Sequence, residues 1–153
     1  MLYKVKENYV VKLREINKEN FWEIIDLKVL DEQKEYVLEN SISIAQAKVQ
    51  PECIPMAIYN DETLVGFLMY CIDTDDGNYW IYRFMIDKNF QRKGYGKKAT
   101  ELLLDEIKRD KNHNKIILDV KRESIAAVEL YKSFGFEFTG QIYGTSHVME
   151  LSY

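Results

Sequence analysis

FMIDKNFQRKGYGKKATELLLDEI, residues 84–107, joins an apolar run to a second apolar pattern through a basic loop that contains two glycines. The second pattern repeats at helical spacing and predicts a helix from about Gly94 to Arg109. Four cations lie at the start of this helix: Arg92, Lys93, Lys97 and Lys98. Because a helix N-terminus is partly positive, each is unfavourable there by about 0.3–1 kcal/mol. The cluster therefore predicts a bound anion, and the alternative is a solvated basic helix end.

The two glycines of the loop indicate which anion is expected. Gly94 and Gly96 let the backbone turn tightly and present several N–H groups at a helix start, which suits phosphate. GYGKKA (94–99) formally matches the dinucleotide fingerprint G-x-G-x-x-A, with Asp119 ending the next strand. That interpretation is disfavoured because residues 87–93 separate the preceding strand from the first glycine, and because only one βαβ unit is visible. The sequence has no P-loop signature.

Two motifs resemble those of the GNAT (GCN5-related) N-acetyltransferases. QRKGYG (91–96) fits Q/R-x-x-G-x-G/A, the loop that binds the acyl-CoA pyrophosphate in that family. Downstream, SIAAVELYKSFGFEFTG (124–140) resembles the family stretch N-x-x-A-x-x-L-Y-x-x-x-G-F. The residues on its positions are Ala127, Leu130, Tyr131, Gly135 and Phe136. The resemblance is specific over residues 79–140 and consistent in element order over the whole chain.

The resemblance implies acetyl-CoA as the cosubstrate, with no metal. Backbone groups of Phe84, Met85 and Ile86 would bind the pantetheine arm, and an N–H near Met85 would bind the thioester oxygen. The pyrophosphate loop would comprise Gln91, Arg92, Lys93, Gly94, Tyr95, Gly96 and Lys97. Arg92, Lys93, Lys97 or Lys98 would reach the 3′-phosphate. The second motif would contribute Ser124, Ala127 and Tyr131, although the family often has Asn at the position of Ser124, whose reach is shorter.

Acetyl transfer to an amine requires a neutral amine, a polarised thioester carbonyl and a proton for the leaving thiolate. The resemblance implies that Tyr131 supplies this proton, because a phenol of pKa ~10 is well matched to a thiol of ~8.5. Tyr131 also lies on the apolar face of its helix, as an ordinary core tyrosine does. The sequence identifies no general base. His113 and His147 qualify by residue type only, without a visible partner, and Cys71 is expected to be an inert strand cysteine.

The periodicity along the chain predicts a mixed α+β fold. Strands are expected at 8–16, 56–59, 64–72, 79–86, 115–120, 136–143 and 147–153, and helices at about 21–28, 41–48, 94–109 and 124–134. The order is β-α-α-β-β-β-α-β-α-β-β, with one βαβ crossover over residues 79–120. The resemblance implies the GNAT fold, a mixed and mostly antiparallel central sheet flanked by helices. Asn17 is the expected cap of the first helix, and Pro51 and Pro55 are expected to bracket a loop.

The length and composition fit a single globular domain over residues 1–153, and the resemblance implies that it is an N-acetyltransferase domain. Acids outnumber bases by 25 to 21, a net charge of −4, so a nucleic-acid partner is not expected. The longest apolar run, residues 64–72, is far shorter than the ~20 residues of a spanning helix, and the N-terminus lacks a signal-peptide core. Cys53 and Cys71 have neither metal-site nor disulfide spacing. A cytoplasmic protein without a membrane partner is expected, and a homodimer is compatible with the C-terminal strands.

The expected acceptor is a small-molecule amine. DEQKEYVLENSISIAQA (31–47) and residues 79–98 resemble the bacterial spermine/spermidine acetyltransferases of the small GNAT type. Polyamines carry several ammonium groups, which carboxylates and aromatic faces bind. The candidate substrate-binding residues are Glu32, Glu35, Tyr36 and Asp75, together with Asp31, Glu39, Asp73 and Asp76. Aminoglycosides, other small amines and protein amines remain alternative acceptors, and a CoA-binding sensor without turnover is a hypothesis of another class.

Overall fold

The computed structural model describes residues 10–153, so the beginning of the strand expected from Asn8 lies outside the described residues. The strands are β1 (Val11–Glu15), β2 (Ile54–Asn60), β3 (Thr63–Ile72), β4 (Tyr79–Ile86), β5 (Lys115–Val120), β6 (Glu137–Tyr143) and β7 (Ser146–Ser152). The helices are α1 (Phe21–Asp26), α2 (Asn40–Val49), α3 (Tyr95–Lys108) and α4 (Ile125–Ser133), with a short 3₁₀ turn, η1 (Asp31–Gln33). The predicted element order is confirmed.

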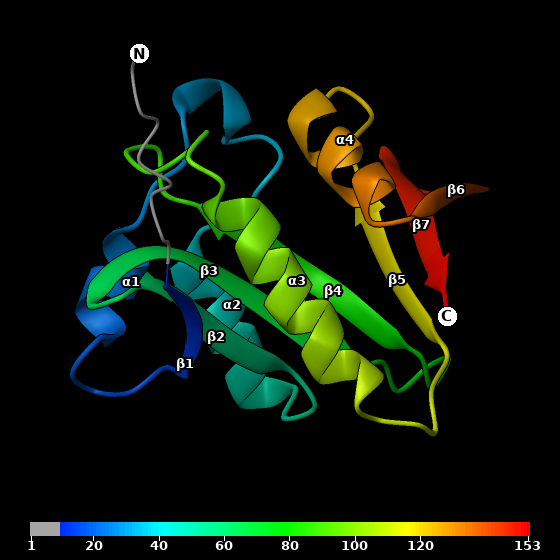
Figure 1. Cartoon of the computed structure of the whole chain (residues 1–153), viewed down its shortest axis with the longest axis horizontal. Coiled ribbons are helices and arrows are strands. Elements are labelled where there is room, and N and C mark those ends of the chain that lie inside the picture. Colours follow the sequence, from blue (N-terminus) through cyan, green and yellow to red (C-terminus); the bar gives the residue numbers. More distant parts are fainter. Residues whose placement is uncertain (1–9) are drawn as a thin grey trace, which may run out of the picture.

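The strands form one seven-stranded sheet in the order β1-β2-β3-β4-β5-β7-β6. β4 and β5 pair in parallel, and the other neighbouring strands pair antiparallel. Helix α3 crosses one face of the sheet, while α1 and α2 lie behind it and α4 lies beside β5 and β7 (Figure 1). The structure is therefore the expected mixed, mostly antiparallel sheet flanked by helices.

Each face of the sheet has its own apolar core. On the α3 face, Ala99, Leu103 and Ile107 pack with strand residues such as Leu68 and Leu118. On the opposite face, a second cluster of buried residues includes Ile24, Phe67, Met69 and Cys71. Every second residue of a strand faces the same side, so β3 supplies side chains to both cores. Leu102 lies at the rim of the buried face of α3 and is 37% exposed.

Two local expectations were wrong. Pro55 lies within β2, opposite Met69 of β3, because the pairing of β2 with β1 ends at Met56 and leaves the other side of Pro55 without a ladder partner. Helix α1 begins at Phe21 after Asn20 rather than after Asn17. The Asn17 side chain instead accepts hydrogen bonds from the Glu19 and Asn20 N–H groups, which caps the turn before the helix.

Strands β4 and β5 diverge soon after they meet. Their pairing covers only the steps from Tyr79–Ile116 to Ile81–Leu118, although β4 continues to Ile86. On the β3 side, Arg83 pairs with Met69 and Ile81 with Tyr70, which leaves Tyr82 as the extra residue of a β-bulge. A bulge bends its strand, and this one lies where the parallel pairing stops. The two strands consequently separate toward their C-terminal ends (Figure 1).

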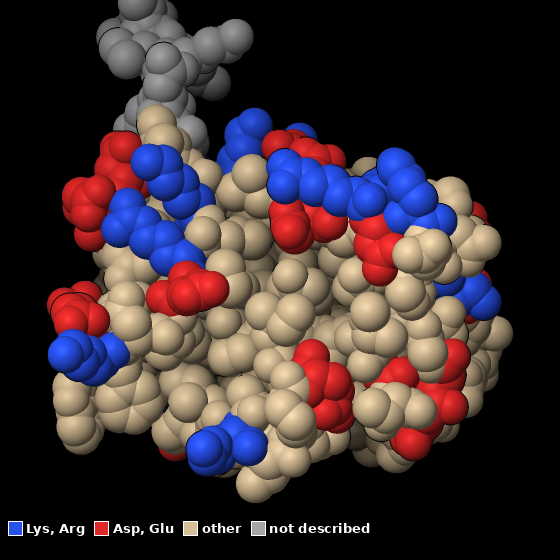
Figure 2. All heavy atoms as spheres, turned by 90° about the horizontal axis from the view of Figure 1, so that it is seen from below, with Lys and Arg blue, Asp and Glu red and all other residues tan. Residues whose placement is uncertain are grey.

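The surface matches the mildly acidic composition. Acidic and basic side chains interleave around a largely uncharged centre on the face seen from below (Figure 2). Among residues 10–153, none of the helices combines the length and apolar character needed to cross a bilayer.

Candidate active site

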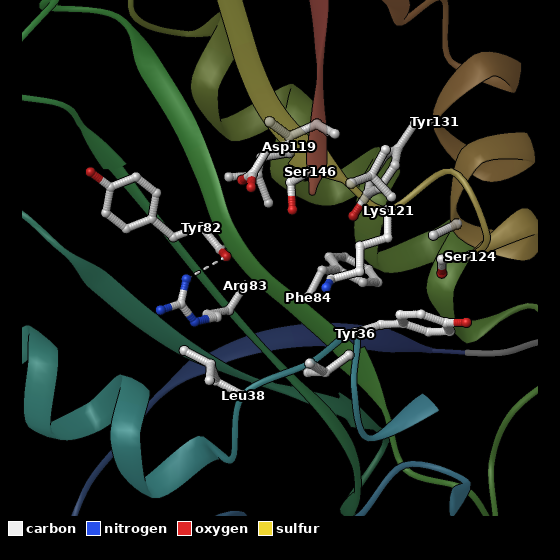
Figure 3. Close-up of a pocket in the computed structure, with 15 residues that line it drawn as sticks. Tyr36, Leu38, Tyr82, Arg83, Phe84, Asp119, Lys121, Ser124, Tyr131 and Ser146 are labelled. Carbon is white, nitrogen blue, oxygen red and sulfur yellow. Dashed lines mark hydrogen bonds between the residues drawn. The ribbon is translucent and has the colours of Figure 1, made fainter. Parts of the chain in front are cut away.

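A cavity of about 180 Å³ opens where β4 and β5 diverge, and we call it the first cavity. Its lining comes from the two strands, from α4 and from the segment before α2 (Figure 3). The lining residues are Tyr36, Val37, Leu38, Ile81, Tyr82, Arg83, Phe84, Leu118, Asp119, Val120, Lys121, Ser124, Ala127, Tyr131 and Ser146. The expected site residues Tyr36, Phe84, Ser124, Ala127 and Tyr131 are thus brought together, although they are far apart in sequence.

Tyr131 combines a core ring with a hydroxyl that points into the first cavity (Figure 3). Its ring packs edge-on against Phe84 and Phe136, with centroid separations of 6.5 and 5.6 Å, and the residue is 7% exposed. Burial raises the pKa of the Tyr131 phenol, and the charge of Asp119 raises it further. The phenol therefore stays protonated near neutral pH, which is the form that can donate a proton. The core and catalytic interpretations of Tyr131 are compatible.

The glycine loop has the geometry of an anion site. Gly94 adopts a φ of 90°, which only glycine tolerates easily, and the first α3 hydrogen bond runs from the Lys98 N–H to the Gly94 carbonyl. The preceding N–H groups of Gly96 and Lys97 therefore point out of the helix end. No side chain of the described residues caps this end. The four loop cations are exposed around it, and Lys98 also pairs with Glu101.

The side chains of two other loop residues, Tyr95 and Gln91, bond to other parts of the protein. The Tyr95 side chain is buried, and its hydroxyl accepts a hydrogen bond from Asn60 Nδ2 at 3.0 Å, so only its backbone lies at the loop. The Gln91 side chain donates to the Ile86 carbonyl at 2.9 Å and to Gln33 Oε1 at 2.7 Å. Gln91 thus ties the loop to the end of β4 and to η1.

Beyond Ile81, the edge of β4 that would face β5 faces the first cavity instead, while the other edge stays paired with β3. Phe84 lines this cavity, whereas the Met85 side chain is buried on the other face of the sheet. β3 approaches closely here because Gly66 has no side chain: a Cβ at Gly66 would lie 2.4 Å from the Met85 carbonyl oxygen. Across the cavity, Ser124 precedes α4 without a side-chain cap hydrogen bond, and its carbonyl accepts from the Val128 N–H.

A second cavity, of about 420 Å³, adjoins the first and shares three residues with it. Its lining residues are Gln46, Asp73, Asp75, Asp76, Trp80, Tyr82, Arg83, Asp119 and Tyr143. Carboxylates and aromatic rings therefore dominate its wall. Two of the carboxylates are held in place: Asp73 accepts from the Tyr82 hydroxyl, and Asp76 accepts from Trp80 Nε1 at 2.8 Å. Such a wall suits an organic cation.

The sequence-predicted acceptor residues divide between the two cavities and the open surface. Tyr36 lines the first cavity and Asp75 the second. Glu32 and Glu35 lie exposed on the segment before α2 and line neither. The sequence did not single out Trp80, Arg83 or Tyr143, and it considered Asp119 only for the disfavoured dinucleotide site. Trp80 and Arg83 lie on β4, Asp119 on β5 and Tyr143 on β6, and no local pattern links the three strands.

Both histidines have partners that the sequence did not reveal. His113 Nδ1 lies 2.8 Å from Asp110 Oδ2, and its ring packs edge-on against Tyr79. His147 Nδ1 accepts from Arg122 Nε at 3.1 Å. Neither histidine lines the two cavities. Cys71 is fully buried, and burial raises the pKa of its thiol to about 12, which fits the expected inert cysteine.

Comparisons with known proteins agree with this architecture. The model of the acetyltransferase (GNAT) family matches residues 11–136. The probable spermine N(1)-acetyltransferase of Bacillus subtilis subsp. natto (strain BEST195) is 31% identical over 138 residues, which cover 86% of this chain and 91% of the relative. The spermine/spermidine N(1)-acetyltransferase of Bacillus subtilis (strain 168) is 30% identical over the same coverage.

A solved structure shares the fold. The spermidine N-acetyltransferase of Vibrio cholerae, in complex with CoA and spermine, superposes with a TM-score of 0.74 at 19% identity, over 93% of this chain and 95% of that one. The family model covers most of the chain, and the two Bacillus relatives match it over nearly their whole length. The chain belongs to the GNAT family and is an acetyl-CoA-dependent N-acetyltransferase.

Proposed function

We propose that this enzyme acetylates a polyamine of the spermidine or spermine type, with both substrates bound at once and the acetyl group passing directly between them. The second cavity carries this proposal, because it combines carboxylates with aromatic rings beside the first cavity. A polyamine presents several ammonium groups along one flexible chain. One nitrogen can lie at the junction of the two cavities while the others contact Asp73, Asp75, Asp76 and the rings of Trp80 and Tyr143.

The first cavity and the glycine loop fit acetyl-CoA as the cosubstrate. The outward N–H groups of Gly96 and Lys97 and the surrounding cations would hold the pyrophosphate and the 3′-phosphate. The free backbone edge of β4 at Phe84–Ile86 would hold the pantetheine arm. A backbone N–H near Met85 would polarise the thioester carbonyl, and Tyr131 would protonate the leaving sulfur. The Bacillus relatives named as spermine or spermidine acetyltransferases support the choice of acceptor.

The test is a graded series of amines. Free thiol release from acetyl-CoA would be followed with spermine, spermidine, a four-carbon diamine, n-butylamine, an aminoglycoside and an alanine-terminated peptide. Each additional ammonium contact with a carboxylate or a ring contributes about 0.5–1 kcal/mol, so two such contacts favour a polyamine over the monoamine about tenfold in kcat/KM. The preference should weaken with added salt, because the second cavity is open to solvent.

Two results would contradict the proposal. An aminoglycoside or the peptide could exceed the polyamines in kcat/KM, which would assign the second cavity to another amine. CoA could bind tightly without thiol release for any acceptor, which would favour a sensor without turnover. Location in the cytoplasm and assembly as a homodimer stay predictions from the sequence.

A further inference from the structure

Arg83 places a fixed positive charge at the junction of the two cavities, because it lines both of them. It follows the bulge residue Tyr82 on β4. Ile81 and Phe84 both pack with the core on the α3 face, so the two residues between them face the other side of the sheet. There the guanidinium donates to the Tyr82 carbonyl at 2.8 Å and to Gln46 Oε1 of α2 at 3.0 Å. These two hydrogen bonds hold the charge at the junction (Figure 3).

This position is unfavourable for a charged side chain. Burial lowers the pKa of Arg83, and the charge of Asp119 opposes that change. Among residues 10–153, Arg83 forms no ion pair, and its buried Nε has no hydrogen-bond partner. Packing alone therefore does not explain an arginine here. Residues that break a local rule of stability in this way are commonly found at functional sites.

The charges that line the two cavities differ in balance. Among the described residues of its wall, the second cavity has one cation, Arg83, and four carboxylates: Asp73, Asp75, Asp76 and Asp119. The first cavity has two cations, Arg83 and Lys121, and one carboxylate, Asp119. Asp119 is exposed, whereas Arg83 is half-buried, and water screens an exposed charge more strongly. An ammonium group is therefore favoured in the second cavity and disfavoured as it approaches the first.

The other titratable groups around Arg83 carry no charge near pH 7. Burial raises the pKa of the Tyr82 and Tyr131 phenols, and it also raises the pKa of the Cys53 thiol, whose charged form would interact with Arg83. Tyr36 and Tyr143 complete the titratable groups of the two walls, and a phenol is neutral in this pH range. The electrostatic balance at the junction thus depends on the arginine, the lysine and the carboxylates.

We propose that Arg83 keeps the acceptor nitrogen uncharged at the junction by opposing any ammonium group there. Acetyl transfer requires the neutral amine, whereas a free alkylamine resembles a lysine side chain, with a pKa near ~10.4, and is almost wholly protonated at pH 7.5. A charge within about 4–6 Å changes the pKa of a neighbouring group by about 1–3, and a like charge lowers that of an ammonium. The proton is released to water. This inference rests on the proposed function only in that the acceptor nitrogen lies at the junction; it does not require a polyamine.

The test is the kinetic signature of Arg83→Met, which removes the charge but keeps a side chain of similar length. Without the repulsion the protonated amine should bind more tightly, and less of the bound amine should be neutral. KM and kcat at pH 7.5 should therefore both fall, each about tenfold or more. The ratio kcat/KM should not fall, because it refers to the free amine. The profile of kcat should move to higher pH by at least about 1, so that the deficit narrows toward pH 10.

Binding measured without turnover gives an independent readout. The Kd of the amine for the enzyme–CoA complex, measured by calorimetry at pH 7.5, should decrease about tenfold in Arg83→Met. A variant that merely disturbed the site would bind the amine more weakly. In urea, Arg83→Met should be no less stable than the wild type, because replacing a buried charge by an apolar side chain of similar size is often neutral or stabilising.

Three controls isolate the effect of the charge. Arg83→Lys keeps the charge and should retain the pH profile of the wild type. Arg14→Met removes an arginine that pairs with Glu62 and lines neither cavity, so its kinetics should equal those of the wild type. A difluoroethylamine is largely neutral at pH 7.5, because its fluorine atoms withdraw electrons from the nitrogen. With this acceptor, Arg83→Met should show no loss of kcat.

Two outcomes would overturn the assignment. A kcat deficit that is the same at every pH, with KM unchanged or raised, would mean that Arg83 positions the substrates or acts on the thioester. Unchanged kcat, KM and pH profile would mean that its charge does not act on the nitrogen. The assay uses the best acceptor of the amine series, so the two proposals fail separately. A preferred acceptor that is not a polyamine contradicts the proposed function alone, and either of the two outcomes with spermidine contradicts the role of Arg83 alone.

Discussion

The two cavities share three residues but are built in different ways. The first cavity and the neighbouring glycine loop, which together form the proposed acetyl-CoA site, rely on backbone: the loop, the free edge of β4 and the start of α4, with Tyr131 as the buried phenol. The second relies on side chains, four carboxylates and three rings supplied by the β3–β4 turn, by β4, by β5 and by β6. A backbone site tolerates little change in element geometry, whereas a side-chain site can be rebuilt residue by residue. We therefore expect substitutions at only a few positions to affect the use of acetyl-CoA. Substitutions at many positions should affect which amine is accepted.

The largest expected effect is that of Tyr131→Phe in the first cavity. Removal of the hydroxyl takes away the proton for the leaving thiolate, and kcat should fall about 100-fold or more. The ring still fills its place between Phe84 and Phe136, so the Kd for CoA should change little. Because burial raises the pKa of Tyr131 above its usual value, the wild-type profile of kcat against pH should show no loss of the acid up to about pH 10.

A matched control separates catalysis from packing. Tyr70→Phe removes a hydroxyl from a partly buried tyrosine that packs against the core on the α3 face and lines neither cavity. Its kcat should equal that of the wild type. If Tyr131→Phe retained full kcat, proton donation would have to come from water or from another group.

The next effect concerns the loop cations and should be about tenfold. Hydrogen bonds to charged groups contribute about 1.5–3 kcal/mol, so Lys93→Ala/Lys97→Ala should weaken CoA binding at least about tenfold. The affinity for dephospho-CoA, which lacks the 3′-phosphate, should fall by a smaller factor in this variant. The ligand-free double variant should be more stable to urea than the wild type, because Lys97 opposes the helix dipole by about 0.3–1 kcal/mol.

Lys108→Ala is the matched control, because it removes a cation from the other end of α3. Lys108 lies in the last turn of α3, where a cation is favourable, so its removal should slightly lower stability and leave CoA affinity unchanged. Equal losses for CoA and dephospho-CoA in the loop variant would assign the two lysines to the pyrophosphate instead of the 3′-phosphate.

The different construction of the cavities explains what the sequence could predict. Gly94, Gly96 and Tyr131 follow local patterns, since a helix start and a helix face fix where they lie. The element order followed from periodicity for the same reason. The first cavity lies where the second motif meets the end of β4, so Phe84, Ser124, Ala127 and Tyr131 were identified from the sequence, whereas most of the other lining residues were not.

The second cavity depends on the bulge at Tyr82, which no local pattern indicated. The extra residue bends β4 and brings Arg83 opposite Asp119, while the β6–β7 hairpin adds Tyr143. Asp75 was predicted because acids in its loop are visible in the sequence, but acids before α2 are equally visible, and Glu32 and Glu35 line neither cavity. An acidic residue in a loop is thus a candidate for binding the amine, and the tertiary structure determines whether it lines the cavity.

A smaller effect is expected in the second cavity, at Tyr143. This residue is 51% exposed, and its ring forms part of the wall together with Trp80, at a centroid separation of 6.3 Å. An exposed cation–π contact contributes about 0.5–1 kcal/mol, so Tyr143→Leu should raise the KM for spermidine about two- to fivefold at constant kcat. Tyr143→Phe keeps the ring face and should behave like the wild type. A fall in kcat for Tyr143→Leu would mean that this residue also acts on the acetyl donor.

The smallest effect should appear only in alkali and involves two phenols, Tyr131 of the first cavity and Tyr82, which lines both cavities. Burial raises the pKa of Tyr131 and of Tyr82, and the hydrogen bond to Asp73 raises the latter further. An unfolded tyrosine titrates near ~10, so below that pH both states hold the proton and the contribution to stability is complete. Above pH 10 the unfolded chain ionises first, and the free energy of unfolding falls.

Urea unfolding at pH 8, 9.5, 10.5 and 11 would measure this fall. Tyr82→Phe/Tyr131→Phe should show a shallower decline than the wild type above pH 10, because neither replaced ring can ionise in the unfolded chain. Tyr79, whose pKa burial and Asp110 raise to about 12, remains in both proteins and sets the residual slope. Parallel curves would mean that the two phenols ionise equally readily in the folded and unfolded states. The hydroxyls of Tyr82 and Tyr131 would then be more accessible to water than their packing indicates.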